Sequence, residues 1–367
     1  MSDFISLLIS LLASFGMNTS PPAPEATQSF TPSASAFIRT DNLHEVAQTY
    51  ARSCARYESL RDPARMGLDG EARMTPKQFD WYLASCAQLE TLLSRQATQA
   101  DYLRWLDRNF QLEPVVAEAS RPMLTAYYEP TIPVSEKATA SLNWPIYAQP
   151  ENGTSATRQS IESGKVKGLK PLYYTDRWSA FVLQVQGSGT GRMSDGKEVR
   201  FVFAGTNELP YTSIGKVLID QGEISKEEIS MQAIGAWMKS HDKKAQDQVY
   251  WKNQRMIFFA LKEDDPNRVG PPGAMSLAEG LTPYRSAAMD WKHFIPGLPV
   301  LVSGELGQQQ QIHRLVIAQD RGAAIKSSVR MDLFLGSGET AEQLAGLTQD
   351  DQARFWRLTL HPQGHRG

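Results

Sequence analysis

Two aspartates, Asp320 and Asp332, have the surroundings that acid–base chemistry requires. Both lie in the segment 318–338, beside apolar residues with the pattern of strands and beside glycines that mark turns. A carboxyl group in such a place can be partly removed from water, which raises its pKa toward the working range of a general acid. The alternative is a pair of solvated turn residues with Arg and Lys partners, which is the commoner state of a carboxylate. These residues alone leave both interpretations open.

Two other segments resemble catalytic or nucleotide-binding motifs without meeting their requirements. The glycine-rich residues 186–191 follow an expected strand, but a phosphate-binding loop needs a helix N-terminus behind it. Residues 193–196 predict a hairpin turn instead, so no nucleotide site is expected. Residues 211–215 are not a nucleophile elbow, because Tyr211 stands where the strained turn requires Gly. Ser213 is therefore interpreted as a groove or turn hydroxyl.

The cysteines and histidines do not predict a metal site. Cys54 and Cys86 are the two cysteines of the chain, which excludes a four-cysteine zinc site and a disulfide-dense scaffold. The closest histidines, His361 and His365, bracket a Pro and a Gly where no helix could align them as ligands. We expect neither a metal nor an organic cofactor.

Three helices are expected before residue 115. Capping boxes that begin at Asn42 and Thr75 each precede an apolar stripe with the period of a helix, and a third helix is expected around residues 102–110. Cys54 and Cys86 both lie on the apolar stripes. They are either core thiols or one disulfide between the helices, and the pattern does not distinguish these.

From residue 124 onward the chain changes to short β-branched and aromatic runs separated by turn residues. The expected strands lie at 180–186, 199–204, 254–261, 298–302, 315–318 and 355–360. One helix interrupts them, with Ile224 and Ile229 as a hydrophobic staple around a Ser225/Glu228 capping box. The glutamine run at 308–311 is expected to be a solvated loop. The predicted fold is mainly β with N-terminal helices, an α+β protein.

Composition limits the classes of partner. Lys and Arg number 38 and Asp and Glu number 40, for a formal net charge of -2. This balance excludes a protein that coats nucleic acid, and it gives no reason to expect strong electrostatic capture by an anionic wall. A chain of 367 residues with 41% hydrophobic residues exceeds the size at which one core usually divides, so two domains are expected.

Residues 1–36 are predicted to be a signal peptide followed by a flexible leader. Residues 4–16 form an apolar stretch of the length of a signal-peptide core, too short to span a bilayer comfortably. No Lys or Arg precedes it, and no clean cleavage site follows. Residues 18–36 are rich in Pro, Ala, Ser and Thr and cannot offset their ordering entropy. We expect export to the periplasm or cell envelope.

Several short motifs occur in a fixed order along the chain. They are Leu124-Thr125-Ala126-Tyr127-Tyr128-Glu129-Pro130, Gln184-Val185-Gln186-Gly187-Ser188-Gly189, Ala204-Gly205-Thr206-Asn207, Pro210-Tyr211-Thr212-Ser213-Ile214-Gly215, Ser230-Met231-Gln232 and the segment 320–338. In this order they closely resemble the membrane-bound lytic transglycosylase A family, over about residues 125–346. Several ordered motifs are far more specific than any one of them.

The resemblance implies a two-domain enzyme. Residues 37–129 plus 267–362 would form a double-psi β-barrel catalytic domain with N-terminal helices, and residues 130–266 an inserted β-barrel domain. Peptidoglycan glycan strands would lie in the groove between them. Together with the leader and the balanced charge, this gives an exported enzyme without a cofactor or nucleic-acid partner, expected to be a monomer. Cell-wall synthesis or division machinery is the further partner to consider.

The resemblance also implies a reaction. The family cleaves the β-1,4 bond between N-acetylmuramic acid and N-acetylglucosamine without water and closes a 1,6-anhydro ring on the muramic sugar. Asp332 matches the single acid/base of the family, and Asp320 matches a second acidic position that we interpret as a supporting group. Thr125 and Gln186 match groove positions of the family, and the remaining residues of the set named next are weaker candidates for substrate contacts. The implied substrate-binding residues are Thr125, Gln186, Tyr127, Tyr211, Ser213 and Lys326.

The chain departs from the family pattern at a few positions. It has Gly322-Ala323 where a Gly-Gly pair is usual, and Ser327-Ser328 follow Lys326 where Gly is usual. An added methyl group at Ala323 would matter only if the backbone there needs a positive φ. No cysteine precedes Cys54, which argues against a lipid anchor to the outer membrane.

Two rival interpretations differ from a transglycosylase in chemistry. A glycan-binding barrel protein of the cell wall would grip the strand without cutting it, and it could lose Asp332 with little penalty. A hydrolase of similar fold would need a second carboxylate near the first, which Asp290 or Asp320 could supply.

Overall fold

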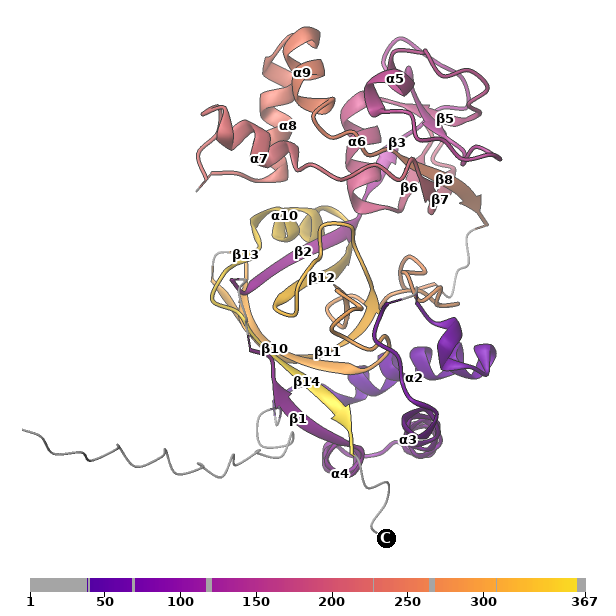
Figure 1. The fold of residues 1–367 in the computed structure, drawn as a ribbon, viewed down its shortest axis with the longest axis vertical. Coiled ribbons are helices and arrows are strands. Elements are labelled where there is room, and N and C mark those ends of the chain that lie inside the picture. The colour runs from indigo at the N-terminus through magenta and orange to yellow at the C-terminus, as the bar shows by residue number, and fades with distance from the viewer. Residues whose placement is uncertain are drawn as a thin grey trace, which may run out of the picture. The chain divides into compact units, whose positions relative to one another are not determined.

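The computed structural model describes residue 38 and residues 40–67, 70–116, 121–226, 228–263, 268–307 and 309–361 (Figure 1). These residues belong to one compact unit. The predicted leader and residues 264–267 at the predicted domain boundary lie outside the described residues, as does His365. Within the described ranges, no helix combines the length and apolar character needed to cross a membrane.

The three N-terminal helices form as predicted. They are α2 (Leu43–Leu60), α3 (Pro76–Ser94) and α4 (Gln99–Asn109). The Asn42 side chain accepts a hydrogen bond from the backbone N–H of Glu45, and Thr75 and Gln78 make a reciprocal capping box. The local capping signals therefore fix where the first two helices begin.

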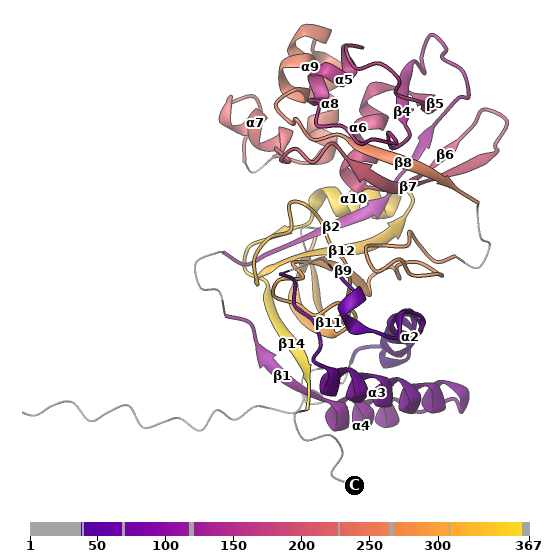
Figure 2. The same cartoon turned by 45° about the vertical axis from the view of Figure 1, so that its right-hand side comes forward.

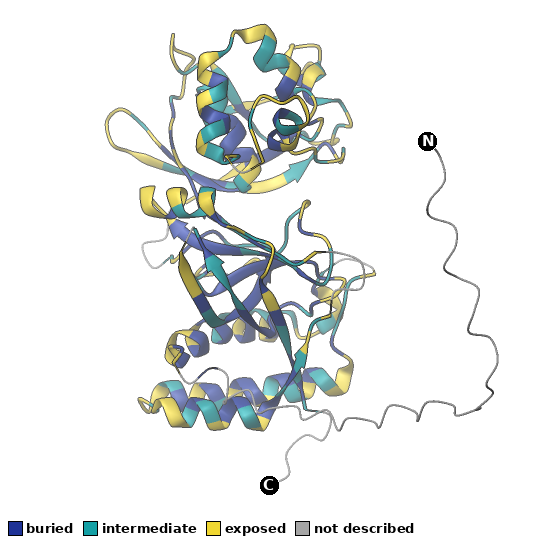
Figure 3. Cartoon of the chain, turned by 90° about the vertical axis from the view of Figure 1, so that its left-hand side faces the viewer, coloured by how far each residue is buried: buried dark blue, intermediate teal, exposed yellow. Residues whose placement is uncertain are grey.

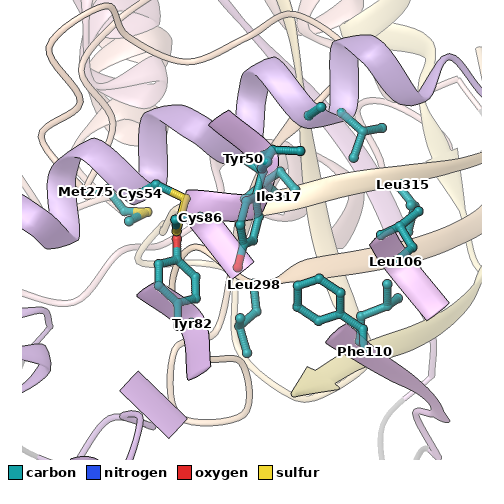
Figure 4. Close-up of a cluster of buried hydrophobic side chains, with 14 of the residues drawn as sticks. Tyr50, Cys54, Tyr82, Cys86, Leu106, Phe110, Met275, Leu298, Leu315 and Ile317 are labelled. Carbon is teal, nitrogen blue, oxygen red and sulfur yellow. A yellow bond between two sulfur atoms is a disulfide. The ribbon is translucent and has the colours of Figure 1, made fainter. Parts of the chain in front are cut away.

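A disulfide between Cys54 and Cys86 joins α2 to α3. It lies in a cluster of buried side chains that includes Tyr50 and Tyr82, and the cluster continues onto the strands beneath the helices (Figure 4). The interhelical disulfide is thus the correct one of the two alternatives that the sequence left open. It fixes the helical layer that packs on the main sheet.

The main sheet has eight strands in the order β1-β14-β10-β11-β9-β12-β2-β13. Their bounds are β1 (Phe110–Pro114), β2 (Met123–Glu129), β9 (Ser286–Met289), β10 (Pro299–Leu306), β11 (Gln310–Asp320), β12 (Arg330–Ser337), β13 (Gln349–Asp350) and β14 (Arg354–Leu360). The strands predicted at 298–302, 315–318 and 355–360 are confirmed. Helix α10 (Glu339–Leu347) follows β12. The sheet is therefore built from both ends of the chain and is interrupted by the segment between β2 and β9.

The sheet combines parallel and antiparallel pairs. β12 runs parallel to β2 and antiparallel to β9, and β11 runs parallel to β9. A hydrogen bond also joins two strands that are far apart in this order. The backbone N–H of Glu305 on β10 donates to Asp350 Oδ2 on β13 at 2.8 Å. The sheet strands are largely buried, whereas the N-terminal helices alternate between buried and exposed faces (Figure 3).

Part of the predicted glutamine loop belongs to the sheet instead. Gln310 and Gln311 begin β11 and pair with Leu306 and Glu305 on β10. Their side chains are exposed, so the residues are solvated as expected, but the backbone hydrogen-bonds in a hairpin.

The segment between β2 and β9 contains its own sheets and helices (Figures 1 and 2). A four-stranded sheet has the order β3-β6-β7-β8, and β4 pairs with β5. The strands are β3 (Thr131–Pro133), β4 (Trp144–Tyr147), β5 (Pro171–Thr175), β6 (Gly189–Arg192), β7 (Glu198–Thr206) and β8 (Ile257–Lys262). The helices described here are α5 (Arg158–Glu162), α6 (Arg177–Gln186), α7 (Ile214–Asp220), α8 (Met231–Ser240) and α9 (Lys243–Tyr250).

The prediction of a single helix in this segment is wrong, and so is the strand predicted at 180–186. Those residues form α6, because Asp176 caps its first turn and Gly187 ends it in the left-handed conformation. The helix expected at the Ser225/Glu228 pair begins only at Met231, where Ser230 is the cap. The strands predicted at 199–204 and 254–261 are confirmed as β7 and β8, although β8 begins at Ile257.

Candidate active site

Asp332 lies in the middle of the main sheet, on β12. The parallel register places it directly beside Thr125 on β2, and its antiparallel neighbour on β9 is Ala288. Thr125 Oγ1 donates a hydrogen bond to Asp332 Oδ1 at 2.7 Å. Burial raises the pKa of Asp332 to about 6, although the Thr125 hydrogen bond and the charge of Arg330 both lower it. A carboxyl group with this pKa can exist in both protonation states near neutral pH, as an acid/base residue must.

Arg330 is a site residue that the sequence interpretation missed. It precedes Asp332 by two positions on the same strand, so both side chains lie on one face of the sheet. Its Nη2 donates to Thr125 Oγ1 at 3.2 Å, and burial lowers its pKa. The two-residue period around Asp332 was the available signal.

Asp320 ends β11 and is held by three donors. Tyr127 Oη donates to its Oδ2 at 2.7 Å, and the backbone N–H groups of Ala274 and Arg321 donate to its Oδ1 at 2.8 and 2.9 Å. Burial raises the pKa of Asp320 despite these bonds. The geometry is that of a carboxyl fixed in place by its neighbours.

Tyr127, predicted as a saccharide contact, is a buried residue whose hydroxyl is directed at Asp320. Burial raises its pKa well above the ordinary value, and the charges of Asp320 and Asp332 raise it further. Tyr127 is therefore close to both carboxyl groups.

The inserted segment contributes residues near the same place. Gln186 at the end of α6 accepts a hydrogen bond from the backbone N–H of Tyr128 on β2 at 3.2 Å. Burial raises the pKa of Tyr211, and the charge of Asp332 raises it too, so the ring lies within electrostatic range of that carboxylate.

Two other predicted substrate contacts have surface positions. Ser213 caps α7 and accepts a hydrogen bond from the backbone N–H of Lys216 at 3.2 Å. Lys326 is exposed on the loop between β11 and β12. Hydrogen bonds therefore join Asp332 to Thr125 and Asp320 to Tyr127. Tyr211 is linked to Asp332 through charge alone, and Lys326 is exposed on the loop between β11 and β12.

The other candidate for a second carboxylate, Asp290, holds that loop. Its Oδ2 accepts from the backbone N–H of Ser327 at 3.0 Å, and its Oδ1 accepts from that of Lys292 at 3.2 Å. Ser327 has a φ of 103°, in the region that favours glycine, whereas Ala323 does not have a positive φ. The departure from the family pattern that strains the backbone is thus the one at Ser327.

Among the residues that the structure describes, no group of three or more His, Cys, Asp or Glu side chains is arranged to hold a metal ion. The side chains joined to Asp332 and Asp320 by hydrogen bonds carry hydroxyl and guanidinium groups.

Two family matches cover the residues of this site. Residues 123–260 match the MltA specific insert domain, and residues 285–359 match the 3D domain. Asp320 and Asp332 lie in the second match, and Thr125, Gln186 and Tyr211 lie in the first. The chain is therefore of the class that combines these two domains.

Individual relatives agree with these matches. Over 248 residues the chain is 33% identical to the membrane-bound lytic murein transglycosylase A of Escherichia coli strain K12. The aligned region covers 65% of this chain and 66% of the E. coli protein, about two thirds of that protein's length. The structure resembles that of a membrane-bound lytic murein transglycosylase from Agrobacterium tumefaciens, with a TM-score of 0.73 at 25% identity over 87% of this chain and 93% of the other. It also resembles E. coli MltA with bound chitohexaose, with a TM-score of 0.66 at 25% identity over 86% and 90% of the chains. The chain belongs to the lytic murein transglycosylase A family.

Proposed function

We propose that this protein is a peptidoglycan lytic transglycosylase that uses Asp332 as its single acid and base. The observation that carries the proposal is Asp332 itself, a carboxyl group with a pKa of about 6 beside Thr125. Relatives named as lytic murein transglycosylases and a structural neighbour with bound chitohexaose support peptidoglycan as the substrate.

The proposed reaction balances without water or a second carboxylate. Protonated Asp332 gives its proton to the glycosidic oxygen as the bond from C1 of N-acetylmuramic acid breaks, which releases the 4-hydroxyl of N-acetylglucosamine. The resulting carboxylate takes the proton of the muramic 6-hydroxyl as that oxygen bonds to C1. The products are a 1,6-anhydromuramic end and an Asp332 that is protonated again.

The other residues have supporting roles in this proposal. Asp320, held by Tyr127 and two backbone N–H groups, would keep the charge near Asp332 fixed. Thr125, Gln186 and Tyr211 would contact the sugar groups beside the scissile bond. We also assign Tyr127, Ser213 and Lys326 to the substrate-binding surface as the weaker members of the set.

We further propose the barrel topology and the domain limits that the resemblance implies. Residues 37–129 plus 267–362 would form a double-psi β-barrel, which the Glu305–Asp350 hydrogen bond between distant members of the sheet supports. Residues 130–266 would form the inserted barrel, which the isolated bridges Ser135–Tyr174 and Ala148–Phe259 between its two sheets support. Export to the periplasm and a monomeric state belong to the same proposal.

The proposal is tested by digesting purified peptidoglycan with the wild-type protein and with Asp332→Asn. Mass spectrometry of the released disaccharide-peptides should find products lighter than hydrolytic ones by one water, with the wild type alone. Products at the hydrolytic mass would contradict the transglycosylase and favour a water-using enzyme. No product from either protein, with glycan binding intact, would favour a glycan-binding protein of the cell wall.

A further inference from the structure

Three side chains form a chain of hydrogen bonds that ends at the proposed acid. Arg330 Nη2 lies 3.2 Å from Thr125 Oγ1, and Thr125 Oγ1 lies 2.7 Å from Asp332 Oδ1. The first and last residues share one face of β12, and the middle one lies across the parallel pair on β2. The distances are those of ordinary to short hydrogen bonds.

The chemistry of the three groups fixes the direction of these bonds. A guanidinium can only donate, so Thr125 Oγ1 must accept from Arg330. A hydroxyl has one proton, and the closest acceptor for that of Thr125 is Asp332 Oδ1, since its other neighbour, the backbone oxygen of Met331, is 3.5 Å away. Asp332 Oδ1 is therefore an acceptor and cannot at the same time donate a proton to Thr125.

We propose that Arg330 is a positioning residue for Asp332, and that through Thr125 it keeps Oδ1 as an acceptor and leaves Oδ2 to carry and transfer the proton. Within the described part of the chain, no side chain or backbone group hydrogen-bonds Oδ2, so this oxygen is available to a substrate. The inference rests on the proposed function and assigns the reacting atom within it.

The environment of Arg330 disfavours a buried charge. Burial lowers its pKa, and its Nε is buried without a hydrogen-bond partner. A buried polar atom without a partner destabilises the folded state, and such atoms need a reason other than packing. Arg314 shares both features, so what distinguishes Arg330 is its hydrogen bond to Thr125 and, through it, its link to the proposed acid.

The charged and titratable groups around Asp332 come from several elements. Arg330 lies on the same strand, Asp320 at the end of β11, and Tyr127 and Tyr211 on β2 and before α7. The charge of Asp320 raises the pKa of Asp332 and so disfavours its ionisation, whereas the charge of Arg330 lowers that pKa and favours ionisation. After β9, Asp290 is occupied with two backbone N–H groups. Removing the charge of Arg330 should therefore make Asp332 harder to ionise.

The first experiment measures the titration of Asp332 directly, by ¹³C NMR of the aspartate carboxyl carbons, with the signal assigned by its loss in Asp332→Asn. Arg330→Gln should move the midpoint upward from about 6 by about one pH unit, and Arg330→Lys, which keeps the charge, should move it less. Arg314→Gln is the matched control, because Arg314 is a partly buried arginine on β11 of the same sheet, with its guanidinium over the Tyr284 ring. The control should leave the Asp332 midpoint in place. An unchanged midpoint in Arg330→Gln, or an equal change in Arg314→Gln, would overturn the inference.

The second experiment asks whether Arg330 acts through Thr125, by a double-mutant cycle on the rate of anhydro-product release. Arg330→Gln should lower kcat about tenfold when Thr125 is present and less than about threefold in Thr125→Val, because coupled residues are not additive. KM should change little, because the affected atom is that of the acid. An equal loss of kcat with Thr125 and in Thr125→Val would overturn the inference that Arg330 acts through Thr125, which is called the relay below.

The two experiments separate this inference from the proposed function. The titration needs no turnover, so an unproductive wild-type protein with the expected midpoint change would contradict the function and retain the relay. If the wild type is lytic but the titration midpoint of Asp332 does not change in Arg330→Gln, the proposed function is retained and the relay is overturned. If Arg330→Gln does not fold, Arg330→Lys decides the cycle, because a single ammonium cannot reproduce the guanidinium geometry and should still slow release.

Discussion

Replacing Asp332 by Asn should abolish lysis and make the protein more stable at neutral pH. The reason is that burial opposes the charged form of Asp332 more than Thr125 and Arg330 favour it, so that its pKa stands at about 6 instead of 3.8. An amide has nearly the same shape, keeps an oxygen that can accept from Thr125, and carries no charge. The variant therefore removes the unfavourable charge and leaves the fold unchanged.

The size of the effect follows from the pKa. About two pKa units at about 1.4 kcal/mol each set an upper bound of about 3 kcal/mol for the penalty of the ionised group. Between pH 3.8 and about 6 the folded protein keeps a proton on Asp332 that the unfolded chain releases, so stability falls as the pH rises through this window. The full penalty is present above about pH 7, and less than about 1 kcal/mol of it remains at pH 4.

The assay is urea unfolding of both proteins at pH 7.5 and pH 4. The free energy of unfolding of Asp332→Asn should exceed that of the wild type by about 2–3 kcal/mol at pH 7.5 and by less than about 1 kcal/mol at pH 4. Asp290→Asn is the matched control, because Asp290 is buried and accepts from two backbone N–H groups. In this variant the amide NH₂ group would face a backbone N–H group that needs an acceptor. The free energy of unfolding of the control should therefore fall by about 1–3 kcal/mol. A less stable Asp332→Asn at pH 7.5, or an equal difference at both pH values, would refute the reasoning.

Other changes have direct readouts. Thr125→Val removes a hydrogen bond that favours the charged carboxylate, so the high-pH limb of lysis should move upward by about one pH unit; an unmoved limb in a pH–rate profile would contradict this. Opening the disulfide in the double variant Cys54→Ala/Cys86→Ala, whose partners are 32 residues apart, should cost about 3–4 kcal/mol in urea unfolding, with no further loss on adding reductant. Ser327→Gly should raise the free energy of unfolding by about 1 kcal/mol because φ there is 103°. Ala323→Gly should give no such gain, and a gain at both positions would point to a cause other than backbone strain.

The parts of the fold that the sequence predicts well are those with strong local signals. The capping residues Asn42 and Thr75 define two helix starts within a few positions of the chain. The strand prediction at 180–186 is wrong because a short apolar run fits a buried strand and a buried helix equally. The deciding signals were Asp176 and Gly187 at its two ends. The cap and the stop residue are more informative here than the run itself.

The site was predictable in its residue types but not in its geometry. Asp332 and Thr125 are 207 residues apart and meet only because β12 and β2 are parallel neighbours. No local pattern encodes that pairing, and the register alone decides which residues touch. Tyr127 illustrates the consequence, because the sequence gives no sign that its hydroxyl donates a hydrogen bond to Asp320. For Arg330 the two-residue period of β12 indicates a position on the same face as Asp332, but its hydrogen bond to Thr125 on the other strand has no local signal.

The N-terminal helices take part in this geometry although they carry none of the proposed catalytic groups. Gln319, the residue before Asp320, is fully buried, and its Nε2 donates to Thr49 O at 2.9 Å and to Ser53 Oγ at 2.7 Å on α2. Ser53 in turn precedes the disulfide cysteine Cys54. The end of β11 is thus tied to a helix that a covalent bond holds in the helical layer. A site with two partly buried carboxyl groups, a partly buried arginine and a strained loop is destabilising by itself, so it needs such a rigid support to keep the two carboxyl groups in place.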